Sequence, residues 1–194
     1  MYKRVFTKLL FLILFCLVLS GCLTSEFKQY FFKINADGSG SGIITFINIV
    51  SEEDEGENVS NTDFDELINS YINGTSFEDA NQNFNVISKE LIEENGMLNG
   101  QVEFTFDNFQ EIGFYQYNSS EHAPIMFYLG SLSETLESTD GDYLGGYTDE
   151  DEGIPMIVWA PGTTEFTFKT VVKDEMSNAH TLLNHYNLWL EINK

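Results

Sequence analysis

The side chains with the most distinctive chemistry in this sequence are two cysteines and three histidines. Cys22 ends the stretch Leu19-Ser20-Gly21-Cys22, in which two small residues stand directly before a thiol. Small residues at this place fit the cleavage site of a secretory signal, and a thiol beside a membrane can be lipidated. Because Cys16 lies in the apolar run before this stretch, we expect no disulfide in the processed chain.

The residues before Cys22 have the composition of a secretory signal. Three basic residues and no acid occur among the first eight positions, and Leu9 to Leu19 is an unbroken apolar run. That run of 11 residues is too short to span a bilayer, which needs about 20. Since Leu19-Ser20-Gly21-Cys22 also fits a lipobox, the segment resembles the signal of bacterial lipoproteins.

The lipoprotein resemblance implies cleavage between Gly21 and Cys22, with diacylglycerol on the sulfur of Cys22 and a fatty acyl chain such as palmitate on the new amino group. Each buried CH₂ group contributes about 0.8 kcal/mol, so two or more chains anchor a protein stably. We therefore expect a protein held at the bacterial cell envelope through Cys22. Leu23 rather than Asp follows the cysteine, which in enterobacteria favours the outer membrane over the inner one.

The processed chain is strongly acidic. Cleavage removes 21 of 194 residues and leaves 173, which suits a short tether at 22–26 and one domain at 27–194. The signal also takes away Lys3, Arg4 and Lys8, so six lysines of the nine basic residues remain against 31 acids and the formal charge is near −25. Phosphates need Lys and Arg partners, so we expect no nucleic-acid partner and repulsion from anionic lipid headgroups.

The remaining reactive side chains form no catalytic pattern. His180 and His185 are five residues apart, which places them off a common helical face, and His122 lies far from both in the sequence. The chain has no Gly-x-Ser-x-Gly elbow, phosphate loop, His-Glu-x-x-His motif or cysteine cluster. No carboxylate pair is singled out among the acids. We expect no catalytic residue, no cofactor and no metal site.

Two acidic stretches raise the alternative of calcium binding. Five of the eight residues at 51–58 are acids, but they lack the spacing of a ligand set. Asn35-Ala36-Asp37-Gly38 has part of a calcium-loop pattern, but Lys33 and Ile44 stand where the pattern needs acids. Turn chemistry explains the second stretch and a solvated loop explains the first.

Alternating apolar residues predict an antiparallel sheet. Residues 27–35 and 43–50 are rich in aromatic and β-branched side chains and predict one hairpin. Residues 84–93 and 97–107 predict a second hairpin around a type I′ turn at Asn95-Gly96. In the strand after this turn, every second side chain is apolar apart from Gly100: Leu98, Val102, Phe104 and Phe106. One face of the sheet is therefore expected to be buried and the other solvated.

Two helices are expected to cover the buried face, which gives an α+β fold. Residues 62–73 carry one apolar stripe, with Thr62 as the expected N-cap and Gly74 as the stop; the stripe is Phe64, Leu67, Ile68, Tyr71 and Ile72. A second helix is predicted from Met176 through Asn187. Residues 188–192 either extend this helix, which the pattern favours, or return as an edge strand.

The middle of the chain predicts further strands and a long loop. Residues 125–129 form one strand, and residues 156–160 and 165–173 are expected to be neighbours around Pro161-Gly162. A short helical turn is expected within 108–117. Residues 130–153 are polar and contain several glycines, so they predict a long loop. Because loops of that length in a compact domain are functional or disordered, a recognition surface is expected there first.

The order of these motifs resembles that of bacterial lipoproteins with an LppM-type domain. The shared features are the lipobox, the Asn35-Ala36-Asp37-Gly38-Ser39-Gly40 hairpin, a helix at Thr62, the strand from Glu94-Asn95-Gly96 to Phe106, the Phe109-Gln110-Glu111-Ile112 turn and Ala160-Pro161-Gly162. They cover most of residues 22–170, and the segment after Thr170 departs from the pattern. The resemblance implies a compact α+β envelope domain with a binding or assembly role towards lipid or glycolipid, and it transfers no catalytic residue.

These observations favour a non-catalytic, membrane-anchored module that binds an envelope protein or a glycolipid. The first alternative is binding of a lipid or another small apolar ligand between the sheet and a helix, which requires a cavity of at least about 300 Å³. Calcium binding at the acidic surface and hydrolysis are the remaining alternatives, and hydrolysis is the least supported.

Overall fold

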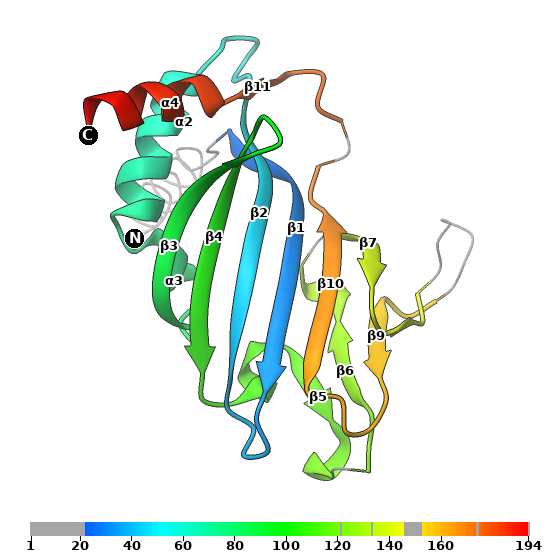
Figure 1. The fold of residues 1–194 in the computed structure, drawn as a ribbon. Coiled ribbons are helices and arrows are strands. Elements are labelled where there is room, and N and C mark those ends of the chain that lie inside the picture. The colour runs from blue at the N-terminus through cyan, green and yellow to red at the C-terminus, as the bar shows by residue number, and fades with distance from the viewer. Residues whose placement is uncertain (1–21, 121, 133, 146–152, 174, 194) are drawn as a thin grey trace, which may run out of the picture.

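The computed structural model describes residues 22–120, 122–132, 134–145, 153–173 and 175–193, so the predicted signal lies outside the described residues. These residues form two antiparallel β-sheets with short helices, which confirms the predicted α+β class (Figure 1). The large sheet has the order β3 (Asn85–Glu94), β4 (Met97–Phe106), β2 (Gly40–Glu52), β1 (Leu23–Ile34), β10 (Glu165–Val171) and β7 (Thr135–Thr139), and β11 (Ala179–Thr181) pairs with the end of β2.

The two predicted hairpins are confirmed. β1 and β2 pair from Leu23↔Ser51 to Ile34↔Gly40, and β3 and β4 pair around Asn95-Gly96. Asn95 and Gly96 have φ values of 53° and 76°, as a type I′ turn requires. The four alternating apolar side chains of β4 are buried, so one face of the sheet is covered as expected.

The tether predicted at residues 22–26 is wrong, because strand β1 begins at Leu23. β2 continues to Glu52, and this extra length gives the start of β1 a pairing partner. The backbone N–H of Glu52 also donates to the carbonyl oxygen of Cys22 at 2.8 Å. The sheet therefore starts one residue after the predicted lipidation site.

A left-handed residue bends the long hairpin. Asn48 has a φ of 57°, and its backbone N–H donates to Oδ1 of Asn99 while its side chain donates to Glu26. Phe46 and Ile49 consequently both pack on the covered face although they are three residues apart. Strict alternation would have placed the side chain of residue 48 on that face. Because of the bend, β2 contributes side chains both to the cluster under the helices and to the cluster under the second sheet.

The second sheet was not predicted. It has the order β5 (Phe114–Gln116), β6 (Ile125–Tyr128), β9 (Met156–Trp159) and β8 (Asp142–Tyr143). The inner strand predicted at 156–160 is present as β9, which ends at Trp159, but β9 pairs with β6 and β8, whereas β10 pairs with β1 and β7. The neighbour relation predicted across Pro161-Gly162 is wrong, because the two strands separate into different sheets.

The long loop predicted at residues 130–153 is also wrong over its described part. β7 adds a strand to the large sheet and β8 adds one to the second sheet, while residues 133 and 146–152 lie outside the described residues. Both strands are short, and each lies at the edge of its sheet. An edge strand is partly exposed to solvent, which fits the polar side chains that both strands carry. The helical turn expected within 108–117 is η3 (Phe109–Ile112), followed by β5 rather than more helix.

The first predicted helix is present with different geometry. α2 (Ser60–Glu66) starts two residues before Thr62, and Oδ1 of Asn58 accepts hydrogen bonds from the backbone and hydroxyl of Ser60. The helix continues as the π-helix η2 (Leu67–Ile72), in which the N–H of Asn73 donates to the carbonyl five residues earlier. Wider turns break the apolar stripe, so Tyr71 is 37% exposed.

The C-terminal helix begins later than predicted. α4 spans Leu183–Ile192, which confirms helix for residues 188–192, but β11 occupies Ala179–Thr181 where a helix was expected. The start of this segment pairs with the end of β2, from Ala179↔Glu52 to Thr181↔Val50. Pairing with the free edge of the extended β2 strand therefore stabilises a strand at 179–181, in place of the helix that the sequence pattern predicts.

Two different layers cover the same face of the large sheet. At one end, α2, η2 and α4 pack on Ile49 and Leu98. At the other end, the second sheet packs its rings on those of the large sheet, with Phe32 next to Phe114 and Trp159 next to Phe166. Gly42 leaves room for the buried ring of Phe104, since a Cβ at position 42 would be 2.6 Å from Cζ of Phe104. The covered face is therefore shared between helices and a sheet (Figure 1).

Candidate ligand-binding cavity

A partly open cavity of about 840 Å³ lies where these two coverings meet. Its floor is the middle of the large sheet. η2 and the short helix α3 (Ser76–Ala80) line it on one side, and residues around η3, β6 and η5 (Leu129–Ser131) line it on the other. Its lining is mainly apolar, and its volume lies within the range of about 300–1,000 Å³ that is usual for ligand pockets.

Two neighbouring rows of cross-strand partners make the floor. One row runs across four strands from Lys89 through Val102 and Ile44 to Tyr30. The next row runs from Leu91 through Gly100 and Phe46 to Lys28, which pairs with Thr170 of β10. Since side chains in one row point to the same face, each row has an apolar middle and a lysine at one end.

The wall at β3 is closed by the ion pair of Lys89. Its Nζ lies 2.7 Å from Oε1 of Glu78 in α3 and donates to the carbonyl oxygen of Gly74 at 2.6 Å. These contacts fasten α3 to the sheet. Although burial pushes the pKa of Glu78 up, the hydrogen bond and charge of Lys89 lower it overall.

The opposite wall is closed by a cluster of donors around Glu134. The carboxylate accepts from Nζ of Lys28 at 2.6 Å, from the hydroxyl of Tyr30 at 2.9 Å and from the hydroxyl of Thr170 at 2.6 Å. The side chain of Glu134 is only 5% exposed, and Lys28 also lies 5.4 Å from the centre of the Phe46 ring. Glu134 thus ties the segment that follows η5 to β1 and β10.

We call Glu134 and its three donors, Lys28, Tyr30 and Thr170, the latch, because their hydrogen bonds hold the segment after η5 on the large sheet. Thr170 is completely buried, so its hydroxyl cannot meet a substrate. Burial first, and then the charge and hydrogen bond of Glu134, raise the pKa of Tyr30 far above its ordinary value, which keeps the phenol protonated. A catalytic nucleophile or base would need a group poised to react, so we assign these side chains to the cavity wall.

The predicted lipidation site adjoins one end of the cavity. Leu23, Thr24 and Ser25, which directly follow Cys22, line the cavity together with Ile49 and Leu67. Burial, followed by the nearby carboxylates of Asp63, Asp54 and Glu52, raises the pKa of the Cys22 thiol. A raised pKa is typical of a thiol that is not a catalytic nucleophile.

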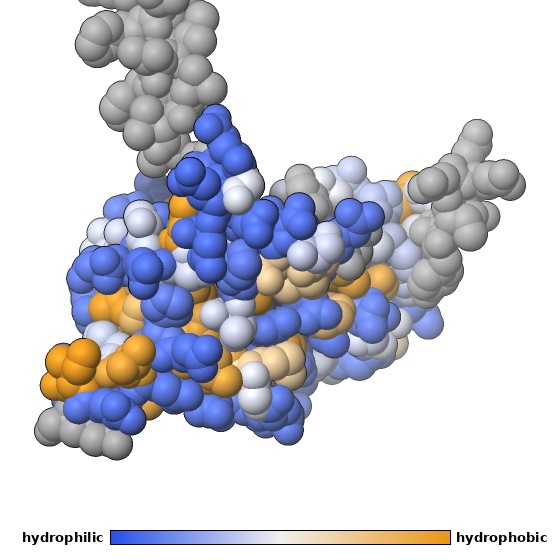
Figure 2. Space-filling view, turned by 90° about the horizontal axis from the view of Figure 1, so that it is seen from above, coloured by the Kyte–Doolittle hydropathy of each residue, from blue (hydrophilic) through white to orange (hydrophobic). Residues whose placement is uncertain are grey.

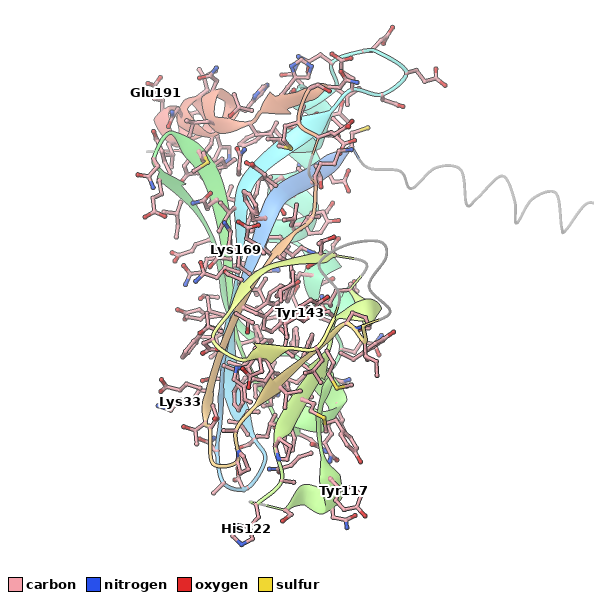
Figure 3. The ribbon with its side chains drawn as sticks, turned by 90° about the vertical axis from the view of Figure 1, so that its right-hand side faces the viewer. Lys33, Tyr117, His122, Tyr143, Lys169 and Glu191 are labelled. Atoms are coloured by element: carbon pink, nitrogen blue, oxygen red, sulfur yellow. The ribbon has the colours of Figure 1, made fainter. Side chains whose placement is uncertain are left out.

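The structure does not bring the three histidines together. His122 lies at the end of the molecule opposite α4, whose Glu191 is labelled in Figure 3. His180 in β11 lies 3.1 Å from Glu53, and His185 in α4 lies 3.1 Å from Asn61. Within the described ranges, no group of three or more His, Cys, Asp or Glu side chains is arranged to hold a metal ion.

The surface around α4 combines hydrophilic and apolar residues. Seen from the end that carries this helix, the molecule is mostly hydrophilic, with apolar side chains gathered near α4 (Figure 2). Exposed Leu188 and Ile192 belong to that helix. Among the described residues, no helix has the length and hydropathy needed to cross a membrane.

No family model, curated protein or solved structure matches the chain. The resemblances to lipoprotein signals and to LppM-type domains therefore stay predictions. The assignment of a site rests on the geometry of the cavity and the residues around it.

Sequence reasoning anticipated a space between sheet and helix but named none of its residues. Lys28 and Glu134 are 106 positions apart, and no local pattern marks either of them as a partner of the other. Residues 130–153, where a recognition surface was expected, contribute one strand to each sheet, and Glu134 of this stretch lines the cavity. The only available signal was Lys28, a charged residue near the start of the aromatic stretch 27–35.

Proposed function

We propose that this protein is a non-catalytic, lipid-anchored envelope protein that holds an apolar or amphipathic lipid in the cavity between its large sheet and its helices. The observation that carries the proposal is the cavity itself, with an apolar floor of Ile44, Phe46 and Val102 and a volume of about 840 Å³. A partly open, mainly apolar cavity of this size is the usual kind of site for a small ligand.

The position of the cavity supports a lipid as the ligand. Leu23 and Ser25 line one end of it, directly after the predicted anchor at Cys22. A lipid-modified Cys22 would hold this end close to the bilayer, and the ligand would move between the bilayer and the cavity over a short path.

Photolabelling of the processed protein in phosphatidylcholine vesicles tests this function. An uncharged iodophenyl-diazirine reagent partitions into apolar spaces and reacts with the residues that surround it. We expect labelled residues on the floor, at Ile44, Phe46 and Val102. We expect Ser76→Trp to reduce that labelling several-fold, because Ser76 lines the cavity and an indole there would take up part of its volume.

Asn73→Trp is the matched control, because Asn73 is exposed, lies three residues from Ser76 and does not line the cavity. It should leave the floor labelling unchanged. If the floor stays unlabelled in the wild type, or if both tryptophan variants are labelled like the wild type, the cavity does not take up lipid and the proposal is wrong.

A further inference from the structure

The two lysines that line the cavity are each paired with a glutamate. Nζ of Lys28 lies 2.6 Å from Glu134 at one wall, and Nζ of Lys89 lies 2.7 Å from Glu78 at the other. Each pair is also satisfied by further hydrogen bonds, to Glu134 from two hydroxyls and from Lys89 to a backbone carbonyl. An incoming anion would therefore have to displace a carboxylate from a lysine.

The other described lysines are engaged away from the cavity. Lys33 pairs with Glu165 and Lys173 pairs with Glu52, at 3.0 Å in both cases, and Nζ of Lys169 lies 3.7 Å from the centre of the Phe27 ring. None of these three lysines lines the cavity. With a formal charge near −25 on the processed chain, the surrounding field also opposes an anionic ligand.

Among the described residues, the rest of the lining contains no further lysine; it includes Glu90 and Glu111 besides uncharged polar groups. The lining between the two ion pairs includes Ser76 and Tyr71, whose hydroxyls can exchange hydrogen bonds with a polar head. Burial, and then the charge of Glu66, raise the pKa of Tyr71, so its phenol stays neutral. Such groups suit hydroxyl or amide partners, whereas an unpaired phosphate or carboxylate is expensive to bury.

We infer that the cavity selects a lipid with an uncharged head, such as an acylglycerol or a glycolipid without phosphate, and rejects the anionic lipid of the same chain length. This inference rests on the proposed lipid-binding function and adds the class of ligand. The two lysine–glutamate pairs are the selective element, because they leave neither of the lining lysines free to bind an anionic head.

Two photoactivatable lipids that differ only by a phosphate test the inference. The processed protein is placed in phosphatidylcholine vesicles with an equal small fraction of diazirine-bearing diacylglycerol or of the matching phosphatidic acid, irradiated, and mapped by mass spectrometry. We expect diacylglycerol to label Ile44, Phe46 and Val102 at least about tenfold more than phosphatidic acid does.

Glu78→Gln should then raise labelling by phosphatidic acid several-fold, because Lys89 loses its carboxylate partner. Glu165→Gln is the matched control: it frees Lys33, which is exposed and does not line the cavity, and should change neither probe. Equal labelling of the wild-type floor by both probes would overturn the inference and leave the proposed function standing. Absence of floor labelling by either probe would contradict the proposed function itself.

Discussion

Glu134 is the residue on which the closed side of the cavity depends. It accepts hydrogen bonds from Lys28, Tyr30 and Thr170, which belong to two strands of the large sheet. The side chain of Glu134 is only 5% exposed, and a buried carboxylate without such partners would be costly. The side chain therefore joins the stability of the fold to the shape of the cavity.

Replacing this carboxylate should destabilise the protein measurably. Glu134→Gln leaves Lys28 without its counter-ion and should lower the free energy of unfolding by about 2–3 kcal/mol, near the low end for broken buried pairs because Lys28 keeps 24% of its side chain exposed. Urea unfolding measures the change. Glu165→Gln breaks a pair that is 55% and 56% exposed and should cost less than about 0.5 kcal/mol; equal losses in the two variants would show that the latch is not structural.

At the scale of elements, the hairpins and helices place the two walls at a fixed separation. β3 and β4 carry Lys89 into the first wall, and α3 meets it with Glu78. The register of β3 on β4 is fixed by the turn at Asn95-Gly96, so a change in that turn affects the wall.

The turn itself gives a prediction about backbone conformation. Gly96 has a φ of 76°, and an alanine there would adopt a left-handed conformation at a cost of about 1–2 kcal/mol in unfolding free energy. Asn95→Gly at the neighbouring position, with a φ of 53°, should change stability by less than about 0.5 kcal/mol. Chemical denaturation compares the two, and a Gly96→Ala variant as stable as Asn95→Gly would contradict the assigned turn.

The contact between α3 and β3 should depend on pH. The pKa of Glu78 is lower in the folded protein than its ordinary value of 4.5. A lowered folded-state pKa stabilises the protein above the unfolded pKa, and this contribution disappears as the pH falls through the folded value. We therefore expect the wild type to lose more stability than Glu78→Gln between about pH 5 and pH 3.

The readout of this experiment is the difference between the two proteins in urea unfolding at each pH, because the many other carboxylates titrate in both. Parallel pH profiles would mean that the ion pair with Lys89 contributes nothing to folding.

Local patterns predicted those elements that local rules determine. Asn95-Gly96 defines a hairpin by its own conformational preferences, and the alternation around Leu98 and Val102 defines a buried face. The pairing of β10 with β1 could not be predicted in this way, since it depends on which free sheet edge the chain meets after folding. The cavity is still harder to predict from local patterns. It lies on the large sheet between the helices and the second sheet, so its position depends on where both of these end.

At the scale of the whole molecule, the proposed anchor at Cys22 determines how close the cavity lies to the membrane. Cys22→Ser should release the protein from the membrane fraction, because the hydroxyl cannot form the lipid thioether. Fractionation followed by mass spectrometry of the first residue measures this. Cys16→Ser, in the predicted signal, should leave the protein membrane-bound with diacylglycerol at Cys22, and a wild-type protein with an unmodified Cys22 would contradict the anchor.

Strand pairing that begins at Leu23 also limits how far the domain can travel. A lipoprotein with a flexible stalk can sample the aqueous space above its bilayer and carry cargo across part of it. With Cys22 lipidated, this domain would be a stationary receptor at the height of the headgroups: whatever it holds must arrive along the membrane plane, and whatever receives the cargo must come to the bilayer surface to collect it.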